Sequence, residues 1–257
     1  MKLKILVVIP TYNCAQQISR VIREFDNNLL DRLSKVIIVD NISSDNTVAA
    51  AKNAIERLGT KKIEIWKNKQ NYNLGGTHKV AFLAGERMNM DYVAILHGDN
   101  QAATAELNNL IDIAEEQPEL GAILGCRFMK GSKLTGYSWQ RIWGNRAINA
   151  VYSLAAMRLS KDLGSGLNLY RLKDLADHRY LGFGDTITFN IDLLLDYYRK
   201  KTRIKFTPIS WKEEDQVSNA RNFRVGSTAI KKLFWWRINK NTLSPHKPSE
   251  YVSSRVK

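Results

Sequence analysis

The stretch Val93-Ala94-Ile95-Leu96-His97-Gly98-Asp99-Asn100-Gln101 decides the fold of this chain. Its apolar residues predict a buried strand, which ends abruptly in side chains that carry oxygen and nitrogen atoms. In α/β proteins, ligands bind at the carboxyl ends of strands. A carboxylate there, two residues before a carboxamide, is typical of a hard-cation site beside a phosphate-bearing substrate. The alternative is a turn followed by a capped helix, because the same residue types favour both.

The surrounding sequence predicts strands that alternate with helices. Continuous apolar runs predict buried strands, and one alternating run predicts a strand near an edge. Apolar residues at helical spacing predict helices between them. The strands are expected at 5–9, 36–39, 62–66, 92–96 and 122–124, and the helices at 15–30, 45–58, 77–88 and 103–116. This alternation predicts an α/β fold with right-handed crossovers and a mostly parallel sheet flanked by helices.

The regular pattern ends after Cys126. A loop over 128–136 precedes an amphipathic stretch over 138–159, and a turn is expected at 162–166. A helix over 189–200 and a strand over 203–206 follow. A chain of 257 residues is near the upper limit for one hydrophobic core. We therefore expect one domain over 1–225, followed by a basic and aromatic tail over 226–257.

The composition indicates an anionic partner. The formal net charge is +14, which fits nucleic acid, an anionic membrane or phosphorylated substrates.

The two cysteines, Cys14 and Cys126, lack CxxC spacing, so a disulfide framework or a zinc site is not expected and a reducing compartment fits. The apolar run at the start ends at Pro10 without a cleavage site, which favours a first strand over a signal peptide. No apolar stretch approaches the roughly 18 residues that span a bilayer.

Polar residues follow three of the predicted strands. They occur at 10–13, at 40–47 and at 97–101. Because the carboxyl ends of parallel strands share one edge of a sheet, these segments are expected to line one crevice. Tyr12 can stack on a base, and Asp40 can accept hydrogen bonds from a base or a ribose. Each also has a simpler interpretation, since Tyr12 can pack and Asp40 can cap the next helix.

These motifs, in this order, resemble family 2 glycosyltransferases of the GT-A fold. The first half carries the resemblance in Val8-Ile9-Pro10-Thr11-Tyr12-Asn13, Val39-Asp40-Asn41-Ile42-Ser43-Ser44-Asp45-Asn46-Thr47, Asn73-Leu74-Gly75-Gly76 and His97-Gly98-Asp99-Asn100-Gln101. The second half resembles the dolichol-phosphate-mannose synthase branch, also called the polyprenyl-phosphate glycosyltransferases. Its motifs are Gly125-Cys126-Arg127-Phe128, Arg141 with Asn145, Asp162-Leu163-Gly164-Ser165-Gly166, Tyr170-Arg171, Pro208-Ile209 and the segment 218–224. The resemblance covers roughly residues 4–225.

The resemblance implies transfer of a sugar from a UDP- or GDP-linked donor to a lipid-linked acceptor, most directly polyprenyl phosphate, with inversion at the anomeric carbon. Asp99 and Gln101 would bind Mg²⁺ or Mn²⁺, which neutralises charge on the leaving diphosphate. Arginine suits the acceptor phosphate because its planar fork is always charged. The implied donor site comprises Pro10, Thr11, Tyr12, Asn13, Asp40, Asn73, Gly75, His97, Gly98 and Asp99. The implied acceptor-phosphate site comprises Arg127, Arg141, Asn145, Arg221 and Arg224.

The sequence also departs from the family pattern. His97 replaces the first carboxylate of the Asp-X-Asp motif, which leaves the choice of metal open. Asn41 replaces the usual second Asp after its strand, and Cys14 replaces an acidic residue. These departures motivate one alternative from another class, a non-catalytic relative that binds a nucleotide or polyanion.

Two motifs keep two interpretations each. Asp185 is a candidate catalytic base for a sugar-hydroxyl acceptor on a growing glycan, or a helix N-cap; a phosphate acceptor needs no base. Asn73 to Gly75 opens a helix, where backbone amides can approach a phosphate, or it forms a plain turn.

The tail is expected to meet a membrane. Residues 230–240 place aromatic and aliphatic side chains beside Lys and Arg, as in an interfacial helix on anionic lipid. The stretch 138–159 is instead expected to pack on the domain. No RNA- or DNA-binding signature accompanies the charge, so no nucleic-acid partner is expected. The expected location is cytoplasmic, peripheral at the inner face of the cell membrane.

Overall fold

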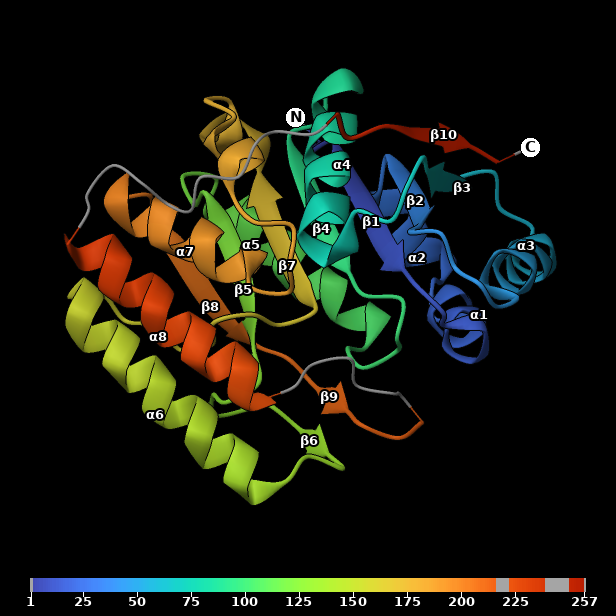
Figure 1. The fold of residues 1–257 in the computed structure, drawn as a ribbon. Helices are drawn as coiled ribbons and strands as arrows, with labels where there is room; N and C mark the ends of the chain where they lie inside the picture. Colours follow the sequence, from blue (N-terminus) through green and yellow to red (C-terminus); the bar gives the residue numbers. More distant parts are fainter. Residues whose placement is uncertain (1, 216–221, 239–249, 257) are drawn as a thin grey trace.

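The computed structural model describes residues 2–215, 222–238 and 250–256. An eight-stranded sheet in the order β10-β3-β2-β1-β4-β7-β5-β8 runs through the middle of the molecule, between layers of helices (Figure 1). Its strands are β1 (Ile5–Thr11), β2 (Lys35–Asp40), β3 (Ile63–Asn68), β4 (Tyr92–Leu96), β5 (Ala122–Cys126), β7 (Leu167–Arg171), β8 (Ile204–Pro208) and β10 (Ser253–Arg255). A small second sheet pairs β6 (Leu134–Thr135) with β9 (Trp211–Lys212).

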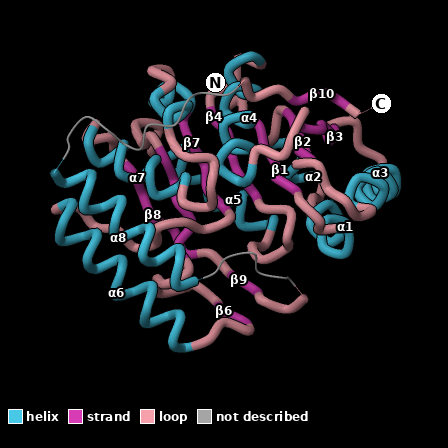
Figure 2. The backbone as a smooth tube through the Cα atoms, in the orientation of Figure 1, coloured by secondary structure: helices cyan, strands magenta, loops and turns pink. Residues whose placement is uncertain are grey.

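The helices connect the strands and cover both faces of the sheet (Figure 2). They are α1 (Ala15–Arg23), α2 (Asn27–Arg32), α3 (Thr47–Leu58), α4 (Asn73–Arg87), α5 (Leu107–Glu116), α6 (Trp139–Ala156), α7 (Phe189–Arg199) and α8 (Asn222–Ile238). Short 3₁₀ turns lie at Thr104–Glu106, Leu172–Leu175 and Arg179–Gly182.

Strand residues alternate between two hydrophobic cores, because successive side chains of a strand point to opposite faces. In β1, Ile5, Val7 and Ile9 pack with α1, α2, α3 and α5. Leu6 and Val8 face the other way and pack with α4 and α7, together with residues of α6 and α8. The central strands are buried on both faces, which explains why their sequences are continuous apolar runs.

The predicted α/β fold with a mostly parallel sheet is confirmed. β1 pairs in parallel with β2 and β4, and β2 with β3. The sequence did not predict β7, which lies antiparallel between β4 and β5. The motif Tyr170-Arg171 is the end of this strand. It was missed because an inserted antiparallel strand breaks the βαβ alternation from which the order of the sheet was inferred.

Two predicted helices differ most from the observed ones. The helix expected over 15–30 is two helices, because the Asp26 side chain accepts the Leu29 backbone N–H at 2.7 Å and starts α2. The helix expected from Thr77 begins at Asn73. The Gly-rich segment therefore lies in the first turn of α4 rather than before it.

The stretch 138–159 contains α6, and the expectation that it packs on the domain is confirmed for one face of the helix only. Tyr152 is buried, and its hydroxyl donates to the Ala229 carbonyl of α8 at 2.5 Å. Trp139, Trp143 and Leu154, by contrast, are 68%, 62% and 80% exposed. The helix thus touches the domain along a narrow strip and presents large apolar side chains outward.

The described part of the tail packs against the domain. Lys232 of α8 forms an ion pair with the buried Asp192 of α7, and Trp236 donates to the Leu195 carbonyl at 3.1 Å. After the undescribed residues 239–249, β10 adds an antiparallel strand to β3. α8 begins before residue 226, the expected start of the tail, so the division at 225/226 stays a prediction.

Candidate functional site

The carboxyl ends of the central strands meet at one edge of the sheet, as the sequence predicts. Thr11 at the end of β1 lies opposite Asp40 at the end of β2, and the Asn41 backbone N–H donates to the Thr11 carbonyl at 2.9 Å. On the other side of β1, where β4 pairs with it, the Gly98 N–H donates to the Pro10 carbonyl at 3.1 Å. The three polar segments after β1, β2 and β4 are therefore neighbours.

Hydrogen bonds fix the loops after β1 and β2 to each other. Asn13 has a positive φ of 52°; its side-chain oxygen accepts the Ser44 N–H at 2.8 Å, and its own N–H donates to the Ser43 hydroxyl at 3.0 Å. Asp45 accepts the Ala15 N–H across the same gap at 3.1 Å. This bracing leaves the Tyr12 side chain 46% exposed at the edge, where a planar ring can take a base.

Asp40 and its neighbour Asn41 are buried and hold loops. Both carboxylate oxygens of Asp40 accept the Ser43 N–H, at 3.2 and 3.3 Å. The Asn41 side-chain oxygen accepts from the Asn68 amide and from the Tyr72 N–H, both at 2.9 Å. Asn41 thus fixes the segment between β3 and α4, a role that the replacement of Asp by Asn did not suggest.

Asp99 follows β4 in a turn that packs tightly on β1. A Cβ atom on Gly98 would lie 2.5 Å from Thr11 Cγ2, so only glycine fits this turn. The Asp99 carboxylate accepts the Gln101 N–H at 3.2 Å. Burial raises the pKa of Asp99, and the neighbouring His97 lowers it.

His97 lies between the site and the core. Its N–H donates to the Gly166 carbonyl at 2.9 Å, and its ring centroid lies 5.9 Å from that of His78 on α4. Burial, and then the proximity of His97, lowers the pKa of His78 to about 3. Burial also lowers the pKa of His97. Both rings are therefore neutral at pH 7, and His97 cannot replace the charge of the family's first carboxylate.

The side-chain oxygens of Asp99 and Gln101 after β4 suit a hard divalent cation whose remaining ligands come from substrate oxygens. Asp99 and Gln101, which is half-buried, supply a carboxylate and a carboxamide. Within the described residues, no three His, Cys, Asp or Glu side chains cluster as a complete metal site. Magnesium is commonly bound by one or two carboxylates together with substrate phosphates, and this pair matches that pattern.

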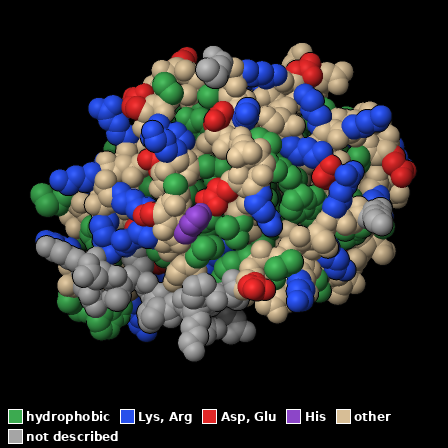
Figure 3. Space-filling model, turned by 90° about the horizontal axis from the view of Figure 1, so that it is seen from above, with side chains coloured by type: hydrophobic (Ala, Val, Ile, Leu, Met, Phe, Trp, Pro, Cys, Tyr) green, Lys and Arg blue, Asp and Glu red, His purple; other side chains and the backbone are tan. Residues whose placement is uncertain are grey.

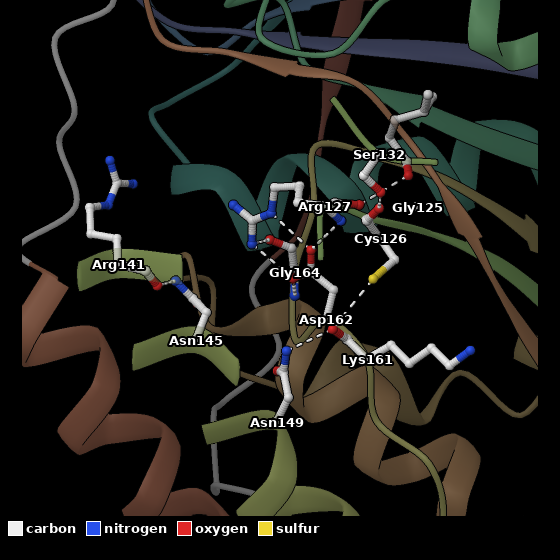
Figure 4. Close-up of polar contacts among 12 residues, drawn as sticks. Gly125, Cys126, Arg127, Ser132, Arg141, Asn145, Asn149, Lys161, Asp162 and Gly164 are labelled. Atoms are coloured by element: carbon white, nitrogen blue, oxygen red, sulfur yellow. Dashed lines mark hydrogen bonds and ion pairs between the residues drawn. The ribbon is translucent and has the colours of Figure 1, made fainter. Parts of the chain in front are cut away.

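Arg127 follows β5 and is held by a buried carboxylate. Its guanidinium donates to both oxygens of Asp162 at 2.8 Å and to the Gly164 carbonyl at 2.9 Å (Figure 4). The guanidinium also lies 5.0 Å from the ring centroid of Trp211. Burial lowers the pKa of Arg127, but Asp162 raises it by more, so the side chain is permanently charged. Arg127 fixes the turn 162–166 at the edge of the site.

Arg141 and Asn145 lie one turn apart on α6. Arg141 forms an ion pair with Glu213 and stacks on Tyr137 at 4.1 Å, while the Asn145 amide donates to the Arg141 carbonyl at 2.7 Å. Figure 4 shows the Arg141 guanidinium extended away from the Arg127 cluster. The two arginines therefore each have a carboxylate partner of their own. Arg221 lies outside the described residues, as does the side chain of Arg224.

Asp185 is held by two partners that the sequence did not reveal. Its carboxylate accepts from the Lys79 ammonium and from the Tyr251 hydroxyl, both at 2.7 Å. The N-cap interpretation is wrong, because α7 begins at Phe189 and Thr188 occupies the cap position. Lys79 is completely buried, and a lone Lys on a helix gives no sequence signal of burial.

Gly75 allows α4 to pack closely against the start of α7. Its N–H donates to the Asp185 carbonyl at 2.8 Å, and a Cβ atom there would lie 2.7 Å from Phe189 Cβ. This N–H is therefore not available to a phosphate, which favours the plain-turn alternative. Asn73 adopts a positive φ of 55°, and its N–H donates to the Asn71 side chain at 2.8 Å.

The structure thus combines an α/β sheet, polar segments that meet at its carboxyl edge, an acidic turn after β4 and an arginine after β5. The sequence profile described as Glycosyl transferase family 2 matches residues 6–179. The chain belongs to this family.

Relatives by sequence support the branch that the motifs resemble. The undecaprenyl-phosphate 4-deoxy-4-formamido-L-arabinose transferase of Sodalis glossinidius is 26% identical over 171 residues, which cover 65% of this chain and 49% of that protein. The dolichol-phosphate mannosyltransferase of Pyrococcus furiosus is 23% identical over 207 residues, covering 80% and 56%. The chain thus spans about half the length of these relatives.

The same fold occurs in a solved structure. Glucosyl-3-phosphoglycerate synthase from Mycobacterium tuberculosis, in a complex with Mn²⁺, UDP-glucose and phosphoglyceric acid, superimposes with a TM-score of 0.67 at 15% identity, covering 91% of this chain and 79% of that one. The likeness confirms a GT-A-like fold. Among the described residues, no helix is both long and apolar enough to cross a membrane.

Proposed function

We propose that the chain transfers a sugar from a UDP- or GDP-linked donor to a polyprenyl phosphate. The observation that carries the proposal is the meeting of Tyr12, Asp40 and Asp99 at one edge of the sheet, beside Arg127. Family membership and relatives named as transferases to undecaprenyl phosphate and dolichol phosphate support it.

In this proposal each residue has a limited task. Tyr12 stacks on the base, and Asp40 keeps the loop beneath the ribose in place. Asp99 and Gln101 would hold Mg²⁺ or Mn²⁺, which when bound would neutralise negative charge on the diphosphate. The acceptor phosphate displaces the diphosphate directly, with inversion. It is ionised at pH 7, so this reaction needs no catalytic base.

Arg127 and Arg141 act on the acceptor side. Because both are paired with carboxylates of the chain, they present hydrogen-bond donors in fixed directions rather than two uncompensated charges. We assign the enzyme to the cytoplasmic face of the membrane, as a peripheral protein, since that is where nucleotide sugars and polyprenyl phosphates meet.

A second candidate is transfer to a sugar hydroxyl, for which Asp185 would be the base. The structure gives this carboxylate two firm partners, Lys79 and Tyr251, which favours a structural role. A non-catalytic nucleotide- or polyanion-binding relative remains the alternative from another class.

The test is a panel of radiolabelled UDP- and GDP-sugars offered to undecaprenyl phosphate with Mg²⁺ or Mn²⁺. We expect one donor to give a lipid product, and Asp185→Asn to retain transfer per folded molecule. A product formed only on glycan hydroxyls, and lost in Asp185→Asn, would instead support the second candidate. Nucleotide binding without any product would favour the non-catalytic alternative.

A further inference from the structure

A groove of about 470 Å³ lies between α6, the loop after β5 and the segment 159–161. The loop after β5, with Phe128, Met129 and Lys130, forms one wall. The α6 residues 146, 149, 150 and 153 form the other wall, and the segment 159–161 closes the end. Asn149 donates to the Lys161 carbonyl at 2.6 Å, which joins α6 to that end segment (Figure 4).

The groove carries positive charge that the chain does not neutralise. Lys130, Arg146 and Lys161 line it, and no carboxylate is among its lining residues. In the part of the chain that the structure describes, none of these three cations forms an ion pair, in contrast to Arg127 and Arg141. Lysine and arginine side chains also spread over the face seen in Figure 3, where Asp and Glu side chains are scattered among them.

Apolar side chains surround this charge. Phe128 and Met129 line the groove, as does Leu159, which is 65% exposed. On α6, Trp143 is 62% exposed, and its ring centroid lies 5.4 Å from the Arg146 guanidinium. An aromatic ring beside an arginine at an apolar border is typical of side chains at a membrane interface.

A second helix extends the apolar surface. α8 lies beside α6 at the same side of the molecule (Figure 1). Its packed face contains Ala229 and Leu233, whereas Phe234, Trp235 and Ile238 are 58%, 59% and 61% exposed. Large exposed apolar patches on one side of a molecule mark an interaction surface. The adjacent uncompensated cations indicate that the partner is apolar and anionic together.

We propose that the groove binds the phosphate headgroup of an anionic phospholipid while the exposed apolar side chains of α6 and α8 lie in the bilayer interface. Lys130, Arg146 and Lys161 contact the phosphate, and Phe128, Met129 and Leu159 contact the start of the acyl chains. The inference deepens the proposed function, because it names the surface by which the enzyme meets the membrane that holds its acceptor. The lining residues of the groove do not include Arg127, Arg141 or Asn145, so the lipid site adjoins the proposed acceptor residues without sharing them.

The test compares two triple variants of equal charge. The groove variant is Lys130→Ala, Arg146→Ala and Lys161→Ala. The control variant is Arg57→Ala, Lys61→Ala and Lys67→Ala, three exposed cations on or near α3 and β3 at the opposite end of the sheet. Circular dichroism and thermal melting first establish that both variants fold. Binding to phosphatidylcholine vesicles with and without 30% phosphatidylglycerol is then measured by sedimentation, without any nucleotide sugar.

We expect wild type to bind the anionic vesicles, the groove variant to bind them at least ten-fold more weakly, and the control to stay within about three-fold of wild type. Equal losses in both variants would overturn the proposal, because net charge alone would then explain binding. Equal binding to uncharged vesicles, or none to anionic ones, would also overturn it. The same holds if the groove variant keeps vesicle binding but loses affinity for polyprenyl phosphate in detergent, since the groove would then hold the acceptor. Because no donor is present, failure here is distinct from failure of sugar transfer.

Discussion

Replacing Lys79 by methionine tests the interpretation of Asp185 as a structural residue. The Lys79 side chain is completely inaccessible to solvent, and its ammonium lies within hydrogen-bond distance of the Leu181 and Phe183 carbonyls, the Asp185 carboxylate and the Tyr251 hydroxyl. This cluster joins α4 to the loop before α7 and to the described C-terminal segment. Methionine has a similar length but offers no donor and no charge.

The magnitude follows from what the substitution leaves behind. Breaking a buried ion pair from one side costs about 3–5 kcal/mol, because the remaining charge is buried without compensation. The Asp185 side chain is 15% exposed, so some water reaches it, and we expect the lower end, about 3 kcal/mol. For a chain of this size, each kcal/mol lowers the melting temperature by about 2–4 °C, which gives a loss of about 6–12 °C.

Differential scanning calorimetry measures this loss. The matched control is Arg203→Met, which removes an exposed ion pair to Glu119, 72% and 49% exposed, and is expected to shift the melting temperature by less than about 2 °C. If Lys79→Met melted as close to wild type as the control does, the cluster would not hold the loop. Asp185 would then return as a candidate base.

Three further predictions concern the strand-end site and its core. Gly98→Ala places a Cβ atom 2.5 Å from Thr11 Cγ2, so we expect it to lower the free energy of unfolding, measured in urea, by about 1–3 kcal/mol. The control is Gly144→Ala, where a Cβ atom meets nothing within 4 Å, and we expect it to leave the free energy of unfolding equal or higher. Equal effects of the two substitutions would contradict the close packing of Gly98 on β1. Tyr12→Ala is expected to weaken nucleotide binding in calorimetric titration by about ten-fold, since stacking on a base contributes about 1–3 kcal/mol, and unchanged affinity would exclude stacking. The pKa of His78 is about 3 in the folded chain, below its unfolded value of 6.5, so stability is complete above pH 6.5 and decreases as the pH falls toward 3. Between pH 7.5 and 5.5 this amounts to about 1.4 kcal/mol, which His78→Phe should abolish in urea titrations at the two pH values.

The sequence predicted the parts of the fold that depend on local pattern. The apolar runs at 5–9, 36–39 and 92–96 are strands, and the polar residues after them meet as expected, because parallel strands must present their carboxyl ends together. It did not predict β7, whose position beside β4 depends on pairing between residues 71 to 79 apart, such as Leu96 and Leu167.

The sequence also did not predict which oppositely charged residues pair with one another. Asp162 holds Arg127, Glu213 holds Arg141 and Lys79 holds Asp185, and these pairs are separated by 35 to 106 residues along the chain. Pattern and spacing identify which residue types gather at the edge of a sheet, but not which charges neutralise one another. For the same reason, the uncompensated cations of the groove became visible only in the structure.

The measurement that tests the central claim most directly is sugar transfer to undecaprenyl phosphate by wild type and Asp99→Ala, each with Mn²⁺ and with a chelator. The account predicts a lipid-linked sugar from wild type with metal, and a loss of at least a hundred-fold both in the variant and after chelation, with both proteins folded. Transfer that persists in Asp99→Ala would contradict the assignment of the site at the end of β4.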